Sequence, residues 1–415
     1  MIIWGMTLIQ MFNPFLKYFL RFEYAPFGLV FCGVVLLFIF IKMITFVLKH
    51  ERFHWLILDS LFLCFIFIGF LYFVLSNQRI LAIEGFKENF KLVYVYFFVR
   101  FLDPDEKQIS AYFYTLFILA VCISFYGIYQ YFFDYFYIAY KFDFIKDETY
   151  HKYFGMAALS GGRRITRRAY SIFPSWQVFA LTVSFALIYF FTNFIVIYRK
   201  WDFKRAAVTC LLIVALVLSF SRTCYLATAV AMFFIWYYFP ERAFKFKTVL
   251  TVSVILIPLT FGMAFYLPPN LSDALVERVM SIASFDYTRT DGHVADMQLY
   301  LILLFANFFG RGLGTSEPWT SLWVESSFFR YTVEIGTISG IVLIFIFGYF
   351  FKYALSVLQS EKIETEKRLP LFAIAITAFF AVAGIPFPVW FSWYPGILVW
   401  TSMAYVTNCY SKLKK

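Results

Sequence analysis

The stretch that decides the fold is Trp323-Val-Glu-Ser-Ser-Phe-Phe-Arg-Tyr-Thr-Val-Glu-Ile-Gly-Thr-Ile-Ser-Gly340, which follows the glycine-rich turn Gly310-Arg-Gly-Leu-Gly314. It leads from polar, glycine-containing sequence directly into an apolar run over 341–351. The carboxylate of Glu325 and the guanidinium of Arg330 are therefore expected where water meets lipid, at the mouth of a membrane helix. Charged groups at such a depth cost free energy and are usually retained for function. We interpret this mouth as a candidate active site.

The composition is that of a membrane protein. Hydrophobic residues make up 62% of the chain and charged residues 15%, and the mean hydropathy is +0.74. Soluble domains contain only about half apolar residues, so the sequence predicts an all-α, polytopic transmembrane helix bundle. The net charge of +11 comes from basic residues spread between apolar runs, not gathered on one soluble face. Nucleic acid is therefore not expected as a partner.

About eleven apolar segments are long enough to cross a bilayer, which takes about 20 mostly apolar residues. They cover approximately 25–48, 55–76, 83–101, 109–133, 174–198, 206–220, 223–239, 248–267, 326–351, 370–385 and 389–408. Residues 1–20 form a twelfth span or an interfacial helix, because Asn13, Pro14 and Lys17 interrupt their apolar sequence. The segment 294–309 is too short and polar to span comfortably, so we expect it in the outer interface. Were it to span, every later orientation would be reversed.

The basic residues between the spans alternate onto one side of the membrane, as Lys49, Arg199, Arg242 and Lys367 illustrate. By the positive-inside rule, that side is cytoplasmic, and two long segments then lie on the periplasmic side. The predicted organisation is N-terminal membrane helices (1–133), a first periplasmic loop (134–173), central membrane helices (174–267), a large periplasmic loop with an interfacial helix (268–324) and C-terminal membrane helices (325–415).

The outer segments are rich in arginine, against the charge bias used for orientation. They contain Arg163, Arg164, Arg167, Arg168, Arg278, Arg289, Arg311 and Arg330. The short outer hairpin Ser219-Phe-Ser-Arg-Thr223 adds Arg222. A guanidinium group binds phosphate through two parallel hydrogen bonds and stays charged at any biological pH, so we expect several of these side chains to converge on a lipid-linked pyrophosphate. For the residues between 163 and 168, the alternative is a solvated loop touching anionic head groups.

The remaining candidates each have a structural alternative. Glu325 could be only a helix N-terminal carboxylate that the macrodipole stabilises. Glu334 could be a buried structural partner of Arg330 at i, i+4 spacing. His293, the one histidine in the second outer loop, could be an ordinary loop residue.

Neither a metal nor a cofactor is expected. The outer loops contain no HExxH, DxD or multi-carboxylate cluster, and the chain has no P-loop and no dinucleotide fingerprint. The cysteines lie in or beside apolar runs without CxxC spacing, so we expect small buried hydrophobes and neither disulfides nor zinc ligands. They are Cys32, Cys64, Cys122, Cys210, Cys224 and Cys409.

Four short pieces between about residues 163 and 340 share an order and spacing with a known superfamily. They are Arg168-Ala-Tyr-Ser-Ile-Phe-Pro-Ser175, Ser221-Arg222-Thr-Cys-Tyr-Leu-Ala227, Glu277-Arg278-Val-Met-Ser-Ile282 with Arg289, and Phe309-Gly-Arg-Gly-Leu-Gly314 with Glu325-Ser-x9-Gly336. Together they resemble the O-antigen polymerase and O-antigen ligase superfamily of bacterial polysaccharide assembly. The resemblance implies a multi-pass protein of the bacterial inner membrane that performs metal-independent glycosyl transfer at the periplasmic face. Its donor would be an undecaprenyl-pyrophosphate-linked oligosaccharide, and a chain-length regulator is a further conceivable partner.

The resemblance also implies residue roles. Glu325 would be the general base for the acceptor hydroxyl, and Arg222 and Arg289 would stabilise the departing pyrophosphate. The substrate-binding residues would be Arg168, Arg278, Arg330, Arg164, Arg311 and His293. Ligases carry a histidine and a small polar residue where this chain has Glu325-Ser326, which favours the polymerase. The alternatives are a ligase that transfers glycan to lipid A-core or protein, and a flippase or other transporter of lipid-linked oligosaccharide.

Overall fold

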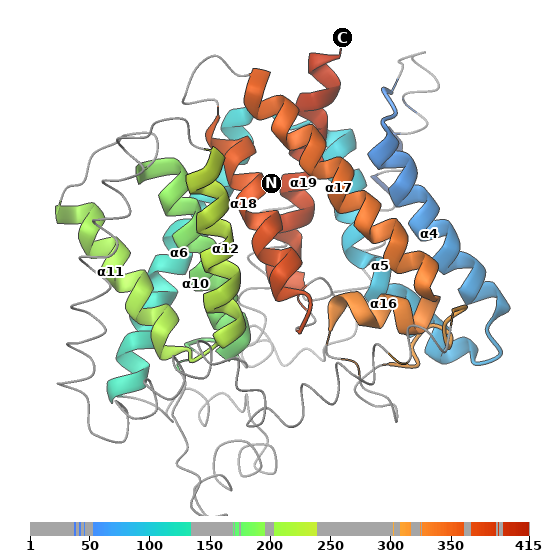
Figure 1. Cartoon of the computed structure of the whole chain (residues 1–415), viewed down its shortest axis with the longest axis horizontal. Helices are drawn as coiled ribbons and strands as arrows, with labels where there is room; N and C mark the ends of the chain where they lie inside the picture. The colour runs from blue at the N-terminus through green and yellow to red at the C-terminus, as the bar shows by residue number, and fades with distance from the viewer. Residues whose placement is uncertain are drawn as a thin grey trace, which may run out of the picture. The chain divides into compact units, whose positions relative to one another are not determined.

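The fold is all-α wherever the structure describes the chain (Figure 1). The computed structural model describes residues 53–133, 169, 171–173, 176–195, 203–238, 308–316, 324, 326–360, 367–386, 389 and 393–414, with the single positions 37, 38, 41, 42, 45 and 302. Every regular element in these ranges is a helix.

Within those ranges, four helices are long and apolar enough to cross a membrane. They are α4 (Ile57–Leu75), α6 (Glu106–Phe133), α10 with its π-helical extension η2 (Trp176–Phe194), and α17 (Thr337–Ser360), and α18 (Arg368–Ala383) is a shorter apolar helix. The chain thus has the character of a membrane protein. The predicted total of eleven or twelve spans, and the division into membrane helices and periplasmic loops, stay predictions.

The helices belong to two compact units, and the boundary falls inside α6. Unit 1 contains α4, α5 (Arg79–Leu102), the beginning of α6, α16 (Ser327–Ile335), α17, α18 and α19 (Trp393–Leu413). Unit 2 contains the rest of α6, α10 (Trp176–Phe190), η2 (Phe191–Ile195), α11 (Phe203–Leu218) and α12 (Arg222–Tyr238).

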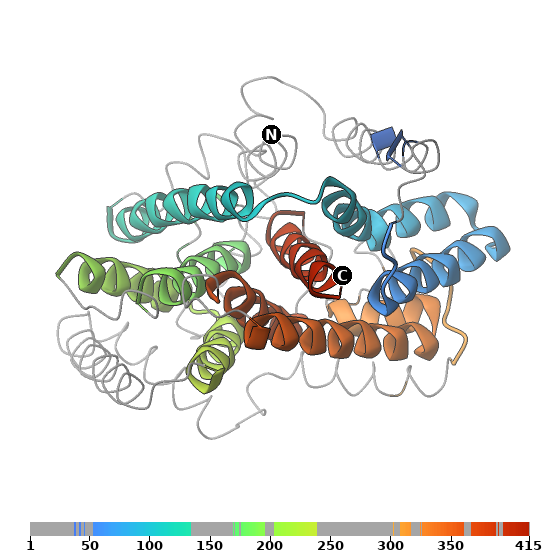
Figure 2. The ribbon, with the colours of Figure 1, turned by 90° about the horizontal axis from the view of Figure 1, so that it is seen from above.

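In unit 1, α19 packs against both α5 and α17, and Figure 2 shows it between them. Buried aromatic rings also pack α4 against α5 and α19. Phe62 of α4 lies with its ring centroid 4.1 Å from that of Tyr96 on α5 and 5.2 Å from that of Trp400 on α19. Such tilted and edge-on ring pairs add about 0.5–1.5 kcal/mol to the free energy of burial. Aromatic packing therefore joins three helices that lie far apart in the sequence.

The helices of unit 1 alternate in direction, so their connections gather at two ends. At one end, called the α16 end, the N–H of Ser327 donates to the carbonyl of Gly384 at 2.9 Å, and α16 runs across the bundle (Figure 1). At the opposite end, Arg368 pairs with Glu106 at 2.9 Å and Lys412 with Asp103 at 2.8 Å.

A buried ion pair stands at this opposite end. Nε and Nη2 of Arg100 donate to the two carboxylate oxygens of Asp59 at 2.9 and 2.7 Å. The Tyr96 hydroxyl and the N–H of Leu56 also donate to Asp59, at 2.7 and 3.0 Å. Nη1 of Arg100 donates to the side chain of Asn408 on α19. Asp59 is 0% exposed and Arg100 is 4% exposed, so this pair, called the Asp59–Arg100 pair, links α4, α5 and α19 away from water.

Unit 2 is held together by rings and by one buried hydroxyl pair. Phe117 on α6 stacks on Phe190 of α10 with centroids 5.7 Å apart. The Thr228 hydroxyl on α12 donates to that of Ser184 on α10 at 2.9 Å. Each hydroxyl is thereby satisfied inside an apolar interface, where an unpaired one would be costly.

The predicted helical segments agree with the structure wherever it describes them, apart from their ends and one break. The segments 55–76, 83–101, 109–133, 206–220, 223–239 and 370–385 correspond to α4, α5, α6, α11, α12 and α18, and 389–408 corresponds to α19, which begins later and runs to Leu413. The predicted continuous span over 326–351 is wrong, because Gly336 (φ 93°) separates α16 from α17. The segments 1–20, 25–48, 248–267 and 294–309 lie wholly or almost wholly beyond what the structure describes.

The expectation of buried cysteines is wrong for Cys64 on α4 and Cys122 on α6, which are exposed, while Cys224 is buried. In the apolar span of α4, only 28% of the residues are buried inside the protein. A thiol is a weakly polar, small side chain, so an outward apolar face tolerates it as well as the interior does. Cys32 is not among the described residues.

One close helix–turn contact yields a stability prediction. A β-carbon added at Gly85 on α5 would lie 2.2 Å from the amide nitrogen and 2.7 Å from the α-carbon of Gly314. Because the obstacle is backbone, we expect Gly85→Ala to lower the stability of the protein by about 1–3 kcal/mol, as overpacking does. Gly348→Ala on α17 is the matched control, since nothing lies within 4 Å of its added β-carbon. Thermal unfolding of the detergent-solubilised variants would measure both, and equal melting temperatures would contradict the contact.

Candidate functional site

The predicted site residues that the structure describes are Arg222 in unit 2 and Arg311 and Arg330 in unit 1. The others lie in parts of the chain that it does not describe, namely Glu325, Arg289, Arg168, Arg278, Arg164 and His293. The convergence of arginines beside Glu325 therefore stays a prediction. The structure does show which contacts fix the segments that carry Arg222, Arg311 and Arg330.

In unit 1, the glycine-rich turn lies directly against the end of α16. The N–H of Arg311 donates to the carbonyl of Val333 at 2.7 Å, and the N–H of Gly312 donates to that of Glu334 at 3.0 Å. The last carbonyls of a helix have no partner within the helix, so the turn satisfies them. The approach requires glycine, because a β-carbon on Gly310 (φ 71°) would lie 2.5 Å from the amide nitrogen of Gly336.

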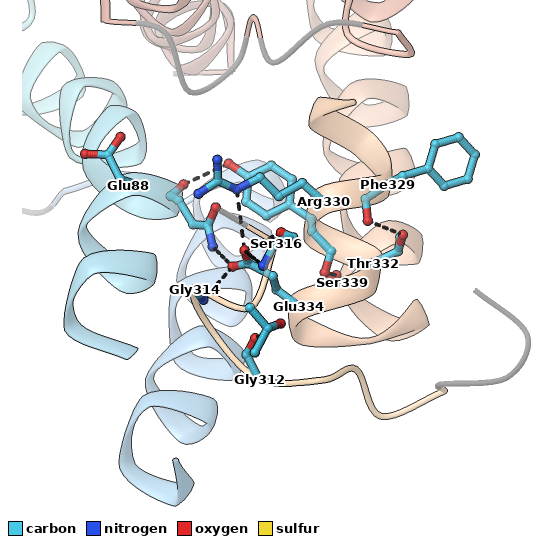
Figure 3. Close-up of polar contacts among 12 residues, drawn as sticks. Glu88, Gly312, Gly314, Ser316, Phe329, Arg330, Thr332, Glu334 and Ser339 are labelled. Carbon is cyan, nitrogen blue, oxygen red and sulfur yellow. Dashed lines mark hydrogen bonds and ion pairs between the residues drawn. The ribbon is translucent and has the colours of Figure 1, made fainter. Parts of the chain in front are cut away.

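The centre of this contact is the carboxylate of Glu334, which is 0% exposed (Figure 3). Oε2 accepts hydrogen bonds from Nδ2 of Asn89 at 2.6 Å and from the N–H of Gly314 at 3.0 Å. Oε1 accepts from the N–H of Ser316 at 3.2 Å and from the Ser316 hydroxyl, and it lies 3.6 Å from Nε of Arg330. We call these five residues the Glu334 cluster.

The geometry supports the structural alternative for Glu334 and changes the expected position of Arg330. Arg330 is only 6% exposed, so it lies inside unit 1 and not at an open mouth. The side chain of Arg311, in contrast, is exposed. The beginning of α16 is fixed by the Ser326 hydroxyl, which accepts from the N–H of Phe329 at 3.2 Å as an N-cap. Glu325 directly precedes this cap in sequence.

In unit 2, the hairpin between α11 and α12 carries Arg222. Helix α11 ends at Leu218, Phe220 adopts a left-handed conformation (φ 50°), and α12 begins at Arg222, which is partly exposed. The N–H of Ala169 donates to the carbonyl of Leu218 at 2.8 Å. The residue that follows Arg168 is therefore bonded to the last residue of α11, directly before the hairpin that carries Arg222.

The segment around Ser171 is anchored to α6. Gln130, which is 0% exposed, accepts from the N–H of Ser171 at 2.7 Å and donates to its carbonyl at 3.2 Å. The Ser171 hydroxyl donates to the carbonyl of Ile123 at 2.8 Å. These bonds hold Ser171 in a left-handed conformation (φ 55°), which a non-glycine residue rarely adopts.

The buried polar groups that no sequence pattern singled out include Asn89, Gln130 and the Asp59–Arg100 pair. A signal existed for the ion pair, because a carboxylate and a guanidinium within apolar segments are costly unless paired. No such signal marked Asn89 or Gln130, since uncharged amides occur on any helix surface. Among the residues that the structure describes, no group of three or more His, Cys, Asp or Glu could hold a metal ion.

These features define the class of protein as a helical membrane protein in which buried polar clusters anchor glycine-rich and arginine-bearing turns at helix ends. No protein-family model matches the chain, and no curated protein sequence matches it.

Proposed function

We propose that the protein is an O-antigen, or surface polysaccharide, polymerase of the bacterial inner membrane. It joins undecaprenyl-pyrophosphate-linked repeat units by metal-independent glycosyl transfer, with its active site facing the periplasm. In this proposal the α16 end of unit 1 faces the periplasm and the opposite end, with Arg368 and Lys412, faces the cytoplasm.

The observation that carries the proposal is the hydrogen bond between Ala169 and Leu218. The resemblance to the superfamily rests on separate pieces of sequence whose arginines act on one pyrophosphate. The bond connects the piece 168–175 to the last residue of α11, three positions before the piece 221–227 begins, and further bonds anchor Ser171 on α6. The contact brings the residue that follows Arg168 to the helix end that precedes Arg222, which is the proximity that a shared pyrophosphate would need.

A second contact in unit 1 supports the same proposal. The turn 309–314 and the segment 326–336 together form the last of the four pieces, and the Glu334 cluster binds them to each other. This contact holds Arg311 at the surface beside the end of α16. We take this contact as support for placing Arg311 in the proposed site.

In the proposed reaction, Glu325 takes the proton of the acceptor hydroxyl on one lipid-linked unit. The hydroxyl oxygen attacks the anomeric carbon of the donor chain, and the bond from that carbon to the pyrophosphate oxygen breaks. Arg222, Arg289 and Arg278 stabilise the negative charge that develops on the departing undecaprenyl pyrophosphate. Arg168 positions the phosphates or the sugar, whereas Arg330, which was also predicted to do so, is buried beside Glu334. A single displacement inverts the anomeric configuration.

Reconstitution tests the function directly. The purified protein in proteoliposomes, supplied only with undecaprenyl-pyrophosphate-linked repeat units, is expected to form a polymer and release undecaprenyl pyrophosphate. Transfer of glycan to lipid A-core or protein without elongation would identify a ligase instead. Movement of the lipid-linked unit across the bilayer without any new glycosidic bond would identify a flippase. Either result would overturn the proposal.

The arginine in the α11–α12 hairpin gives a residue-level prediction. Arg222→Lys keeps the charge but removes the planar fork that binds phosphate through two bonds, so we expect the polymerisation rate to fall by about 100-fold. The control is Arg79→Lys at an exposed arginine of α5, which should leave the rate unchanged. Polymer ladders and initial rates, normalised to the protein in the membrane, measure both. Full activity of Arg222→Lys would exclude bidentate phosphate binding there.

A further inference from the structure

Glu334 accepts more hydrogen bonds than an ion pair with Arg330 requires. Its carboxylate is completely buried, and a buried carboxylate needs hydrogen bonds to offset lost hydration. Three of its donors, the Gly314 N–H, the Ser316 N–H and the Ser316 hydroxyl, belong to the end of the glycine-rich turn and the two residues after it, and not to α16. The carboxylate therefore binds the turn to the helix (Figure 3).

At Arg311 and Gly312, the same turn is bonded to α16 through backbone hydrogen bonds. The N–H groups of Arg311 and Gly312 donate to the carbonyls of Val333 and Glu334 at 2.7 and 3.0 Å. The α-carbon of Arg311 is thus held between two bonds to the last turn of α16, and the residue as a whole is exposed. A guanidinium that starts from a fixed backbone loses less conformational entropy when it binds a ligand.

We infer that Glu334 is a positioning residue of the polymerase site. Its buried carboxylate holds the turn 310–316 so that Arg311 meets the pyrophosphate or glycan of the lipid-linked substrate, and it does not touch the substrate itself. This inference rests on the proposed function for the role of Arg311. It rests on the Glu334 cluster for the placement of the turn.

The informative variant is Glu334→Gln, which keeps the volume and removes one acceptor together with the negative charge 3.6 Å from Nε of Arg330. The new amide NH₂ faces either the donors Asn89 and Gly314 or the donors of Ser316, so one side of the cluster loses its bonds. The turn loosens while the side chain still fills its space. Glu84→Gln on α5 is the control, because Glu84 pairs with Lys87 on a surface where its side chain is 41% exposed.

A double-mutant cycle separates positioning from a structural role. We expect Glu334→Gln and Arg311→Ala each to lower kcat about 10- to 100-fold, as small displacements of a binding group do. The double variant should be no slower than Arg311→Ala alone, because Glu334 then has no guanidinium to place. Glu84→Gln should leave kcat unchanged in both backgrounds. Losses that multiply in the double variant, or a wild-type rate in Glu334→Gln, would overturn the inference.

A labelling experiment tests the placement of the turn without reference to activity. Leu313 is 1% exposed, so Leu313→Cys should react slowly with a membrane-impermeant maleimide, above the background of the native cysteines. With Glu334→Gln added, we expect about tenfold faster labelling. Leu75→Cys, at a position that is 77% exposed at the same end, should react equally in both backgrounds. Unchanged protection of Leu313→Cys would contradict the inference. If the wild-type protein makes no polymer but labelling rises, the proposed function fails and the role of Glu334 in holding the turn stands.

Discussion

Asp59→Leu and Arg100→Met are each expected to destabilise the protein by about 3–5 kcal/mol, because each leaves the other charge buried without its partner. Asp59 is 0% exposed and Arg100 is 4% exposed, and Arg100 donates two parallel hydrogen bonds to Asp59. Asp59 also accepts from the N–H of Leu56, so its loss removes a bond at the beginning of α4. The loss of stability is measured by heating the detergent-solubilised variants and recording the fraction of the protein that remains monodisperse at each temperature.

The double variant Asp59→Leu/Arg100→Met is expected to be much more stable than the sum of the single losses predicts. Replacing both members of a buried ion pair by apolar side chains is often neutral or stabilising. Lys412→Met removes a cation from the same end of unit 1, but its side chain is 56% exposed in a pair with Asp103. An exposed pair contributes about 0–1 kcal/mol, so this control should change the melting temperature little. Additive losses in the double variant would show that the two charges do not act as a pair.

The largest effect on activity is expected from Glu325→Gln. An amide cannot take a proton from the acceptor hydroxyl, so the polymerisation rate should fall about 10²–10⁴-fold, the usual contribution of a general base. The variant should accumulate in the membrane at the wild-type level and should still bind the lipid-linked unit. Ladder formation in cells and initial rates with purified protein measure the loss.

The structural alternative for Glu325 predicts a different result. A carboxylate that serves only the N-terminus of α16 contributes about 0.3–1 kcal/mol of stability through the helix dipole, and its amide variant would polymerise normally. Glu317→Gln changes a carboxylate of the same outer segment that has no proposed role, so it should retain the wild-type ladder. Normal ladders from Glu325→Gln would remove the general base from the mechanism.

The positions of the helices could be predicted because apolar length is a local property of the sequence. The predicted segment 55–76 and the helix Ile57–Leu75 differ by two residues at one end and one at the other. Helix α5 begins at Arg79, earlier than the predicted start at residue 83, because the charged Arg79 lowers the local hydropathy but does not interrupt the helix. A criterion based on the length of apolar runs leaves out polar residues near the end of a helix, even where the helix continues through them.

The break at Gly336 could not be predicted from hydropathy, because an isolated glycine is often tolerated inside a helix. Its cause is long-range, since the turn around Gly310 approaches so closely that a β-carbon on Gly336 would lie 2.5 Å from the carbonyl oxygen of Phe308. Long-range contacts at the candidate site could not be predicted from the sequence either. The i, i+4 spacing of Arg330 and Glu334 could be seen in the sequence, but Asn89 is 245 positions from Glu334. No local pattern connects residues at that separation.

The packing of Gly85 on Gly314 has an evolutionary consequence. Apolar side chains on lipid-facing helices can be exchanged for one another with little cost, so overall similarity between homologues should decay quickly. A residue with a side chain at either of these two positions would push α5 and the turn apart, because each added β-carbon would meet backbone at 2.2 Å. Distant descendants of the same ancestor are therefore expected to share small residues at these two positions and at Gly310 and Gly336, even after the rest of their sequences have diverged beyond recognition.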